Sequence, residues 1–407
     1  YKGISRIELN NPFRMVPIGR GRMNMGEMGS GESILDMEEF NGELYISTMS
    51  GVYKSSTISD IPRFRTLGDI SGSVFDLQRI QPLPGQEFLL AAGDEQIFVI
   101  NQNMSISRIP GGARKIVVDP GQADVFYAAG EDLTSFQYKN GIWENKLRVD
   151  LDDRADEIFL DKHASIWLSS SSGILRLDSM YAVNGPRFTE ELEAGIPVSP
   201  SYKLFREPDS GELLVGSSGG FYHYDPEHDS MVYDSLYNSI LPDGLNKIEA
   251  LYCGADGMYW FSFENEFSGW SILGARKTEG GFQLIHDRPF RVLVPVPTHV
   301  FHTDSDKQLW FSRYDDLFRF YPAHASEETD SLLVLMRSVI LPEDSVLFNG
   351  THFSTGSLGQ HLTQTMQTEE QIPSIHHNFN DVEFHWSAPY FKNRRQIRFS
   401  YYLEGYS

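Results

Sequence analysis

Short stretches of alternating apolar and polar residues, separated by turns rich in Gly, Ser and Asp, run along the first three quarters of the chain. One unit recurs: an apolar triplet ending in small residues, a tight turn, and an alternating aromatic strand. Alternation with a period of two predicts β-strands. The unit occupies seven segments: Gly42–Lys54, Gln86–Ile100, Asp124–Tyr138, Ser165–Leu177, Glu212–Tyr224, Gly257–Ile272 and Lys307–Phe320.

A bulky residue stands at the centre of each unit, and its spacing indicates the architecture. The successive intervals are 44, 37, 41, 47, 46 and 50 residues. Four-stranded propeller blades repeat every ~40–50 residues. The residues that define the intervals are Tyr45, Leu89, Phe126, Trp167, Leu214, Trp260 and Trp310. The sequence therefore predicts an all-β fold with a seven-bladed β-propeller.

A further short apolar strand precedes each unit, as in Ser33–Met37, Lys115–Asp119, Glu157–Asp161 and Val300–Thr303. We expect this strand to be innermost in its blade, followed by the strand with the bulky residue, a third strand, and a weaker outer strand. The seventh unit has no obvious outer strand after Tyr321, and Arg14–Ile18 is expected to supply it.

Helix is almost absent from the pattern. The one short candidate is Thr189–Gly195, which has a Thr cap, two acids in its first turn and a closing Gly.

A polar stretch at Ala325–Asp330 predicts a boundary between a propeller at 1–325 and a second domain at 326–407. Strands are expected at Leu332–Leu341, Ser345–Phe348, Asp381–Trp386 and Gln396–Leu403, with a loop or irregular edge strand at Thr351–Thr368. The chain stops at Ser407 before a seven-stranded sandwich is complete, so we expect a truncated immunoglobulin-like β-sandwich.

Composition narrows the classes of partner. Lys and Arg number 34 and Asp and Glu 56, a formal net charge of −22, which disfavours nucleic acid and anionic lipid surfaces. Cys253 is the only cysteine, so neither an internal disulfide nor a Cys-based metal site is expected. No apolar run approaches the ~20 residues of a membrane span. The chain begins at Tyr1 without a leader, so any signal peptide is expected to have been removed or left out.

Several motifs can be interpreted either as a catalytic or metal site or as an ordinary turn or loop. Gly216–Gly220 fits the nucleophile elbow G-x-S-x-G, but a strand follows it, which favours a blade turn. Asp150–Glu157 resembles a calcium loop without its Gly and terminal Glu, which favours a solvated loop. His376–His377, and His223 with Asp225 and His228, lack a third ligand at metal-site spacing. The basic run Lys392–Arg398 is read as a hairpin turn. No metal and no cofactor are expected.

The turns between the second and third strands are more informative, because in a propeller they all open on one face. They carry eight acids: Asp94, Glu95, Glu131, Asp132, Glu264, Glu266, Asp315 and Asp316. Arg313, Tyr314, Phe267 and Trp270 lie among them. Aromatic rings beside carboxylates and an Arg suit a polyhydroxylated ligand. The candidate ligand-binding residues are Asp94, Glu131, Glu264, Trp270, Arg313, Tyr314 and Asp315; alternatively, the acids only keep the turns soluble.

The repeats and the tail together resemble a known family. The blades are similar to two-component-regulator propeller repeats, and Lys307–Phe320 and Ser165–Leu177 match that pattern best. The tail His376–Tyr406 resembles the triple-tyrosine (Y_Y_Y) domain that follows such propellers, with Ala-Pro-Tyr and a closing Tyr-x-Leu-Glu-Gly-Tyr at Tyr401–Tyr406. Phe399 departs from the pattern, because the family usually has a tyrosine there.

The resemblance implies a sensor without catalytic residues: the periplasmic, extracytoplasmic portion of a membrane-tethered hybrid two-component histidine kinase of the inner membrane, of the Bacteroides type. It implies an oligosaccharide ligand and a homodimer through the triple-tyrosine domain. Two other functions remain open, a propeller glycosidase or lyase and a protein-interaction scaffold. A convergent carboxylate pair with perturbed pKa values in the central funnel would favour the enzyme.

Overall fold

The computed structural model describes residues 11–18, 33–56, 62–177, 188–189, 195–199, 201–293, 295–313, 315–325, 334–342, 345–355, 360–364, 372–376 and 381–387. The chain divides into two compact units, Tyr1–Ala325 and Ser326–Ser407. Each unit is described by itself.

The described residues of the first unit form seven four-stranded antiparallel sheets, which we number in chain order. Sheet 1 holds β2 (Ile34–Phe40), β3 (Glu43–Thr48), β4 (Gly51–Ser56) and β5 (Arg63–Ser71). Sheet 2 holds β6 (Val74–Leu83), β7 (Gln86–Gly93), β8 (Gln96–Asn101) and β9 (Ile106–Pro110). Sheet 3 holds β10 (Lys115–Val118), β11 (Val125–Ala129), β12 (Asp132–Lys139) and β13 (Ile142–Asp150).

The remaining four sheets of this unit follow the same order. Sheet 4 holds β14 (Glu157–Leu160), β15 (Ile166–Ser170), β16 (Gly173–Leu177) and β17 (Phe188–Thr189). Sheet 5 holds β18 (Lys203–Arg206), β19 (Leu213–Ser217), β20 (Gly220–Asp225) and β21 (Ser230–Tyr233). Sheet 6 holds β22 (Leu245–Cys253), β23 (Met258–Asn265), β24 (Gly269–Thr278) and β25 (Gly281–His286). Sheet 7 holds β26 (Phe301–Thr303), β27 (Leu309–Arg313), β28 (Asp316–Phe320) and β1 (Phe13–Val16).

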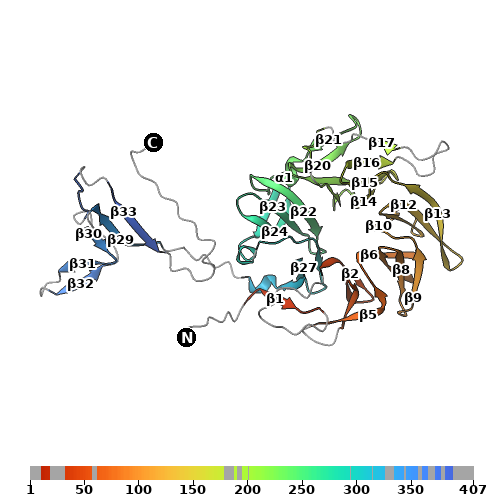
Figure 1. The fold of residues 1–407 in the computed structure, drawn as a ribbon, viewed down its shortest axis with the longest axis horizontal. Helices are drawn as coiled ribbons and strands as arrows, with labels where there is room; N and C mark the ends of the chain where they lie inside the picture. The colour runs from red at the N-terminus through yellow and green to blue at the C-terminus, as the bar shows by residue number, and fades with distance from the viewer. Residues whose placement is uncertain are drawn as a thin grey trace. The chain divides into compact units, whose positions relative to one another are not determined.

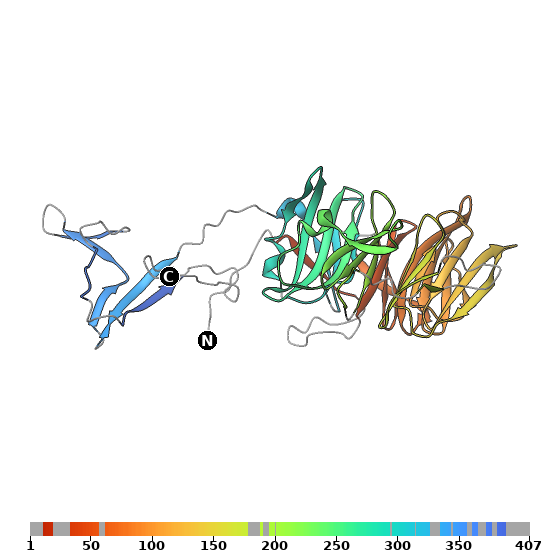
Figure 2. The ribbon, with the colours of Figure 1, turned by 90° about the horizontal axis from the view of Figure 1, so that it is seen from above.

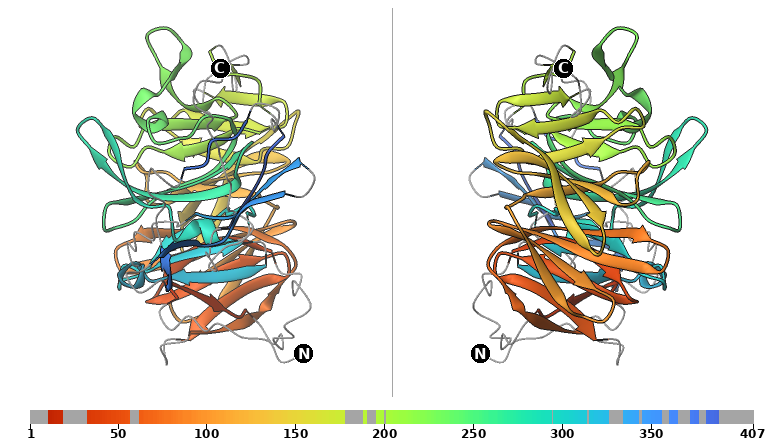
Figure 3. Two further views of the ribbon diagram at one scale, coloured as in Figure 1. Left: turned by 90° about the vertical axis from the view of Figure 1, so that its left-hand side faces the viewer. Right: turned by 90° about the vertical axis from the view of Figure 1, so that its right-hand side faces the viewer.

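The sheets surround a common centre (Figure 1). Each first strand contacts the first strand of the next sheet, and β26 contacts β2. Seven apolar clusters form the core, and each draws on two neighbouring sheets. Views from above and from the side show the twist of the sheets (Figures 2 and 3). The fold is all-β and of the propeller type, as the sequence pattern predicts.

The bulky residues that define the sequence repeat all lie in second strands and are buried. In sheets 4 and 7 an aspartate from the preceding turn fixes the tryptophan. Asp161 accepts a hydrogen bond from Trp167 Nε1 at 3.1 Å, and Asp304 accepts one from Trp310 Nε1 at 2.9 Å. The same carboxylates accept backbone N–H groups of their turns. Each aspartate therefore shapes its turn and orients the buried indole beside it.

The N-terminal strand β1 pairs antiparallel with β28, from Phe13 opposite Phe320 to Val16 opposite Leu317. This pairing confirms the expectation that the segment near Arg14–Ile18 completes the seventh sheet. Phe13 packs against the rings of Phe290, Phe311 and Phe320 at centroid distances of 5.1, 6.1 and 5.2 Å. The first and last parts of this unit are thus joined in one sheet.

Helix is scarce in the described residues. One short α-helix, α1 (Ser235–Asn238), is capped by the Asp234 carboxylate, and η1 (Phe290–Val292) and η2 (Pro322–His324) are single 3₁₀ turns. In the helix candidate Thr189–Gly195, Thr189 belongs to β17, and 190–194 lie outside the described residues. No helix in the described part of the chain has the length and apolar character needed to cross a membrane.

The second unit contains β29 (Leu335–Leu341), β30 (Ser345–Asn349), β31 (His352–Thr355), β32 (His361–Gln364) and β33 (Glu383–Ser387). They form a three-stranded sheet in the order β30-β29-β33 and a β31-β32 hairpin. The hairpin lies where a loop or irregular edge strand was expected, and its Phe353–Thr363 pair is exposed, so no buried stripe marked it in the sequence. The expected strand Gln396–Leu403 lies outside the described residues, and the sandwich remains a prediction.

Candidate functional site

A charged or ionisable residue stands at the start of the innermost strand of every sheet. In six sheets it lies within the first strand, and in the seventh it comes just before that strand. The seven residues, which we call the charged ring, are Asp36, Asp76, Lys115, Glu157, Lys203, Glu249 and His299.

Strand bulges turn two aspartates of the charged ring toward the neighbouring sheet. The β2–β3 register shifts between Ile34 and Asp36, and the β6–β7 register shifts between Val74 and Asp76. A bulge re-aims the side chain at that position. Asp36 Oδ2 accepts the N–H of Leu77 at 2.8 Å, and Asp76 Oδ2 accepts the N–H of Ile116 at 2.9 Å. Each carboxylate thus satisfies a backbone donor of the next inner strand.

Ion pairs join other members of the charged ring, in which acids alternate with basic residues from Asp76 to His299. Lys115 Nζ lies 2.8 Å from Asp76 Oδ1, and Lys203 Nζ lies 2.8 Å from Glu157 Oε1. Glu249 closes the series, because its Oε1 lies 3.6 Å from Lys203 Nζ and 2.8 Å from His299 Nδ1. Side chains of the charged ring therefore link the inner strands of sheets 1 to 3 and those of sheets 4 to 7, in addition to packing.

Two carboxyl groups of the charged ring have pKa values that are shifted in opposite directions. Burial, followed by the neighbouring Asp76, raises the pKa of Asp36 to about 8, although Lys115 opposes the shift. Burial would also raise the pKa of Glu249, but His299 and Lys203 outweigh it and lower the value to about 2. Near neutral pH the Asp36 carboxyl is thus mostly protonated, whereas Glu249 is ionised.

The ring lies at the same end of the first unit as the turns between second and third strands. Lys115 pairs with Ala129, Glu157 with Ser169, and Lys203 with Gly216, in each case at or near the end of a second strand. The charged ring and these turns therefore share one face.

Three of the sequence-predicted residues come from facing sides of sheets 6 and 7. Glu264 lies opposite Trp270 in the β23–β24 ladder, on the same side of the sheet as buried Trp260. Arg313 shares its side of β27 with Phe311, and Phe311 packs in one cluster with Trp260. Glu264, Trp270 and Arg313 thus border the same interface between two sheets.

Lys247 joins Trp270 to the charged ring. It lies opposite Glu264 in the β22–β23 ladder, its Nζ lies 5.9 Å from the centroid of the Trp270 ring, and the same atom is 2.7 Å from Glu249 Oε2. An aromatic ring, two acids and a cation are therefore contiguous on this face of the first unit. We call Lys247, Glu249, Glu264 and Trp270 the Trp270 cluster.

The other predicted residues are distributed around the rim. Asp94 and Glu131 are exposed in the turns of sheets 2 and 3. Asp315 accepts a hydrogen bond from Ser33 Oγ at 3.1 Å. Tyr314 lies outside the described residues. No contact brings Asp94, Glu131 or Asp315 to the Trp270 cluster.

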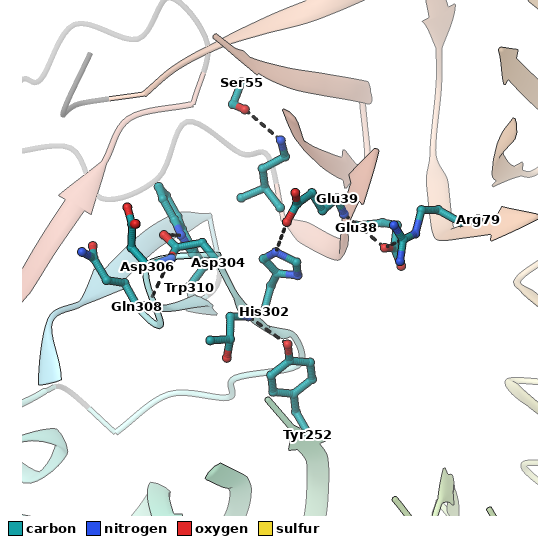
Figure 4. Close-up of polar contacts among 12 residues, drawn as sticks. Glu38, Glu39, Ser55, Arg79, Tyr252, His302, Asp304, Asp306, Gln308 and Trp310 are labelled. Atoms are coloured by element: carbon teal, nitrogen blue, oxygen red, sulfur yellow. Dashed lines mark hydrogen bonds and ion pairs between the residues drawn. The ribbon is translucent and has the colours of Figure 1, made fainter. Parts of the chain in front are cut away.

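A second polar cluster occurs farther along the inner strands (Figure 4). Glu38 Oε1 lies 3.0 Å from Arg79 Nε, and Glu39 Oε2 lies 3.8 Å from His302 Nε2. Burial raises the pKa of Glu38 to about 7, against the effect of Arg79, and burial lowers the pKa of His302. These contacts link sheets 1, 2 and 7.

The remaining motifs have structural roles where they are described. Gly216–Gly220 is the turn between β19 and β20, with Ser217 Oγ donating to Gly220 O. Asp153 accepts from Ser171 Oγ, and hydrogen bonds from this serine turn lower the pKa of Asp153 to about 2. His223 contacts Asp234, and His228 contacts Asp225. The described residues contain no group of three or more His, Cys, Asp or Glu side chains placed to hold a metal ion.

Comparisons with known proteins give likenesses in fold. No family model and no curated protein matches the sequence. The structure is similar to the extracellular domains of two proteins described as hybrid two-component systems of B. thetaiotaomicron. For BT3049 the TM-score is 0.53 and the identity 12%, over 86% of this chain and 55% of that one. For BT4673 the TM-score is 0.51 and the identity 14%, over 80% of this chain and 40% of that one.

The present chain thus spans about half the length of those domains or less. A Staphylococcus aureus virginiamycin B lyase, in a catalytically inactive form with quinupristin, is also similar. Its TM-score is 0.51 and its identity 12%, over 76% of this chain and 98% of that one. The same all-β propeller architecture therefore occurs in sensor domains and in an enzyme.

Proposed function

We propose that this chain is the extracytoplasmic ligand-sensing part of a membrane-spanning two-component regulator of the hybrid histidine kinase type. Two independent lines support the proposal. The repeats and the tail resemble that family in sequence, and the fold is similar to extracellular domains of two such systems. On this proposal the chain belongs on the periplasmic side of an inner membrane.

The proposal interprets the first unit as a closed seven-bladed propeller, with sheets 1–7 as its blades. The contacts of β26 with β2 and the pairing of β1 with β28 support this interpretation. The second unit is interpreted as part of a triple-tyrosine sandwich, on the resemblance of its tail.

The Trp270 cluster is the observation that carries a ligand-binding role for the first unit. Trp270 is partly exposed, and Lys247, Glu264 and Glu249 surround it with charged hydrogen-bonding groups. A flat apolar ring beside charged donors and acceptors suits a sugar, whose apolar face stacks while its hydroxyl groups form charge-assisted hydrogen bonds. The ligand on this proposal is an oligosaccharide.

Signalling on this proposal requires two arrangements of a homodimer formed through the second unit. An oligosaccharide shifts the balance between them only by the difference in its affinity for the two. Sedimentation velocity with and without ligand tests this step, and a ligand-dependent change in the dimer is the expected result.

A thermal-shift screen of this chain against an oligosaccharide library tests the proposed function. We expect at least one oligosaccharide to raise the melting temperature of the wild type and of Trp386→Ala, but not of Trp270→Ala. Trp386 is the matched control, because it is a half-exposed tryptophan of the second unit. No shift with any oligosaccharide would contradict the proposal and would favour the protein-interaction scaffold.

One observation favours a propeller glycosidase or lyase as the second candidate. Asp36 and Asp76 are close enough that Asp76 raises the pKa of Asp36, and such carboxyl pairs can serve acid–base chemistry. Both oxygens of each carboxyl group are, however, already engaged. Asp36 binds the N–H groups of Met37 and Leu77, and Asp76 binds Lys115 and the N–H of Ile116.

Mass spectrometry of an oligosaccharide from the screen distinguishes the two candidates. We expect it to be recovered unchanged after incubation with the chain. Cleavage by the wild type that is lost in Asp76→Asn would establish the enzyme.

A further inference from the structure

Arg313, the last residue of β27, is buried without an ion pair, and the nearest acid that acts on it is Asp316. Only 7% of its surface is exposed. Among the described residues it has no hydrogen-bond acceptor and no ion-pair partner, and the Phe318 ring lies 5.8 Å from its Cζ. A guanidinium has five N–H donors, and its burial without acceptors is unfavourable. Burial accordingly lowers the pKa of Arg313 to about 10.

Other shielded arginines of the first unit each have at least one acceptor for a guanidinium nitrogen. Arg319 Nη2 lies 2.7 Å from Asp304 Oδ2, and Arg176 Nη1 lies 2.9 Å from Asp229 Oδ1. Arg206 donates to two backbone carbonyls, each at 3.0 Å. Arg313 therefore departs from the rule that this chain otherwise follows.

Arg313 lies close to the candidate ligand-binding residues of sheet 6. Its side of β27 faces sheet 6, where Glu264 and Trp270 lie on the opposing side. In contrast to Nε of Arg319, its guanidinium nitrogens are not sealed from solvent. Part of the guanidinium surface thus reaches solvent, although only 7% of the residue is exposed.

The surrounding charges restrict what can bind. Asp316 is paired with Arg313 in the β27–β28 ladder but is exposed, and the two side chains form no ion pair. Lys247, beside Trp270, is already bound to Glu249. With Glu264 and Asp316 nearby, the site would repel a densely charged polyanion, whereas a single oxyanion placed at the guanidinium is favoured.

We propose that Arg313 is the anion-binding subsite of the ligand site and holds one carboxylate or sulfate group of an acidic oligosaccharide, with a sugar ring on Trp270. The planar guanidinium fork matches the two oxygens of such a group. This inference rests on the proposed sensor function and specifies its ligand class. The acidic group supplies the hydrogen-bond acceptors that the Arg313 guanidinium lacks among the described residues.

Calorimetric titration with matched probes tests the inference. The probes are a galacturonate trisaccharide, the same trisaccharide with its carboxyl groups reduced to alcohols, galactose 6-sulfate, and inorganic sulfate. We expect an acidic saccharide to bind the wild type at least about tenfold more tightly than the neutral trisaccharide, because charge-assisted bonds are the stronger ones. The carboxylate and sulfate probes distinguish the two anion types.

Three variants separate recognition from structure. Arg313→Met should remove the preference for acidic probes without lowering the melting temperature, because no internal partner is lost. Arg313→Lys should retain part of the preference. Arg319→Met is the control, and it should lower the melting temperature because it leaves Asp304 without its cation.

Equal binding of acidic and neutral trisaccharides would overturn the inference and leave the proposed function intact. A loss of stability in Arg313→Met as large as that in Arg319→Met would also overturn it, because Arg313 would then have an internal partner. Binding of inorganic sulfate at Arg313, with no saccharide bound, would support the anion subsite and contradict the oligosaccharide sensor.

Discussion

The charged ring shows how a residue's position in a strand decides its chemistry. Asp36 and Asp76 lie at bulges, where their carboxyl groups satisfy backbone donors of the next sheet. Their proximity and burial keep a proton on Asp36 at pH values where an exposed aspartate is ionised. The pairs of Lys203 and His299 with Glu249 have the opposite effect on that carboxylate.

The pH dependence of stability follows from these shifts. The pKa of Asp36 is about 8 in the folded chain against 3.8 for an unperturbed aspartate, and that of Glu38 is about 7 against 4.5 for an unperturbed glutamate. Between these values the folded chain holds more protons than the unfolded chain, so stability falls as pH rises, by up to about 1.4 kcal/mol per pH unit for each proton. The lowered pKa values of Glu249 and Asp153 act below about pH 4.

Substitution of Asp36 by Asn tests this account. The fall in melting temperature between pH 5 and pH 8 should be smaller in Asp36→Asn than in the wild type. Asp150→Asn, which alters an exposed carboxylate of sheet 3, should retain the wild-type slope. Equal slopes in all three proteins would show that Asp36 titrates normally.

Sequence reasoning found some of these residues and missed others for a physical reason. Glu264, Trp270 and Arg313 could be identified, because a repeat alignment places every turn of one kind on one face. The charged ring was not identified, since its residues are single charges within short apolar strands. A signal was available: SILDM, KIVVD and EIFLD each contain a charged residue at the position that later joins the ring.

At the scale of elements, the repeated apolar strands predicted strand order well, because each sheet packs on both of its neighbours and its second strands are buried on both faces, as in β11, β15 and β19. It was less informative in the second unit, where the exposed β31–β32 hairpin has no buried face to impose alternation. The pairing of β1 with β28 could be predicted because the seventh repeat lacked an outer strand.

Deletion of β1 tests the closure of the first unit. Removal of residues 1–18 takes away the ladder to β28 and the Phe13 side chain, which lies within 6.1 Å of three other rings. Deletion of a large aromatic side chain from a core costs about 3–5 kcal/mol. The melting temperature should therefore fall by several degrees or more. Removal of residues 1–10, which keeps β1, is the control; an unchanged melting temperature in both would exclude closure by this strand.

At the scale of the molecule, the fold permits several functions, since similar propellers serve in sensors and in a lyase. The distinction rests on the face that carries the charged ring, where the carboxyl pair of Asp36 and Asp76 is occupied by structural hydrogen bonds and Trp270 is partly exposed. On the proposed function, the first unit binds a ligand without turnover. The second unit contributes the proposed dimer, which the sequence predicts only through resemblance.

The most direct test of the central claim is calorimetric titration of the chain with an oligosaccharide from the thermal-shift screen. The account predicts saturable binding with one site per chain, binding at least about tenfold weaker in Trp270→Ala, and an affinity in Trp386→Ala equal to that of the wild type. Equal affinity in the wild type and in Trp270→Ala would contradict the account, because the ligand would then bind away from the Trp270 cluster.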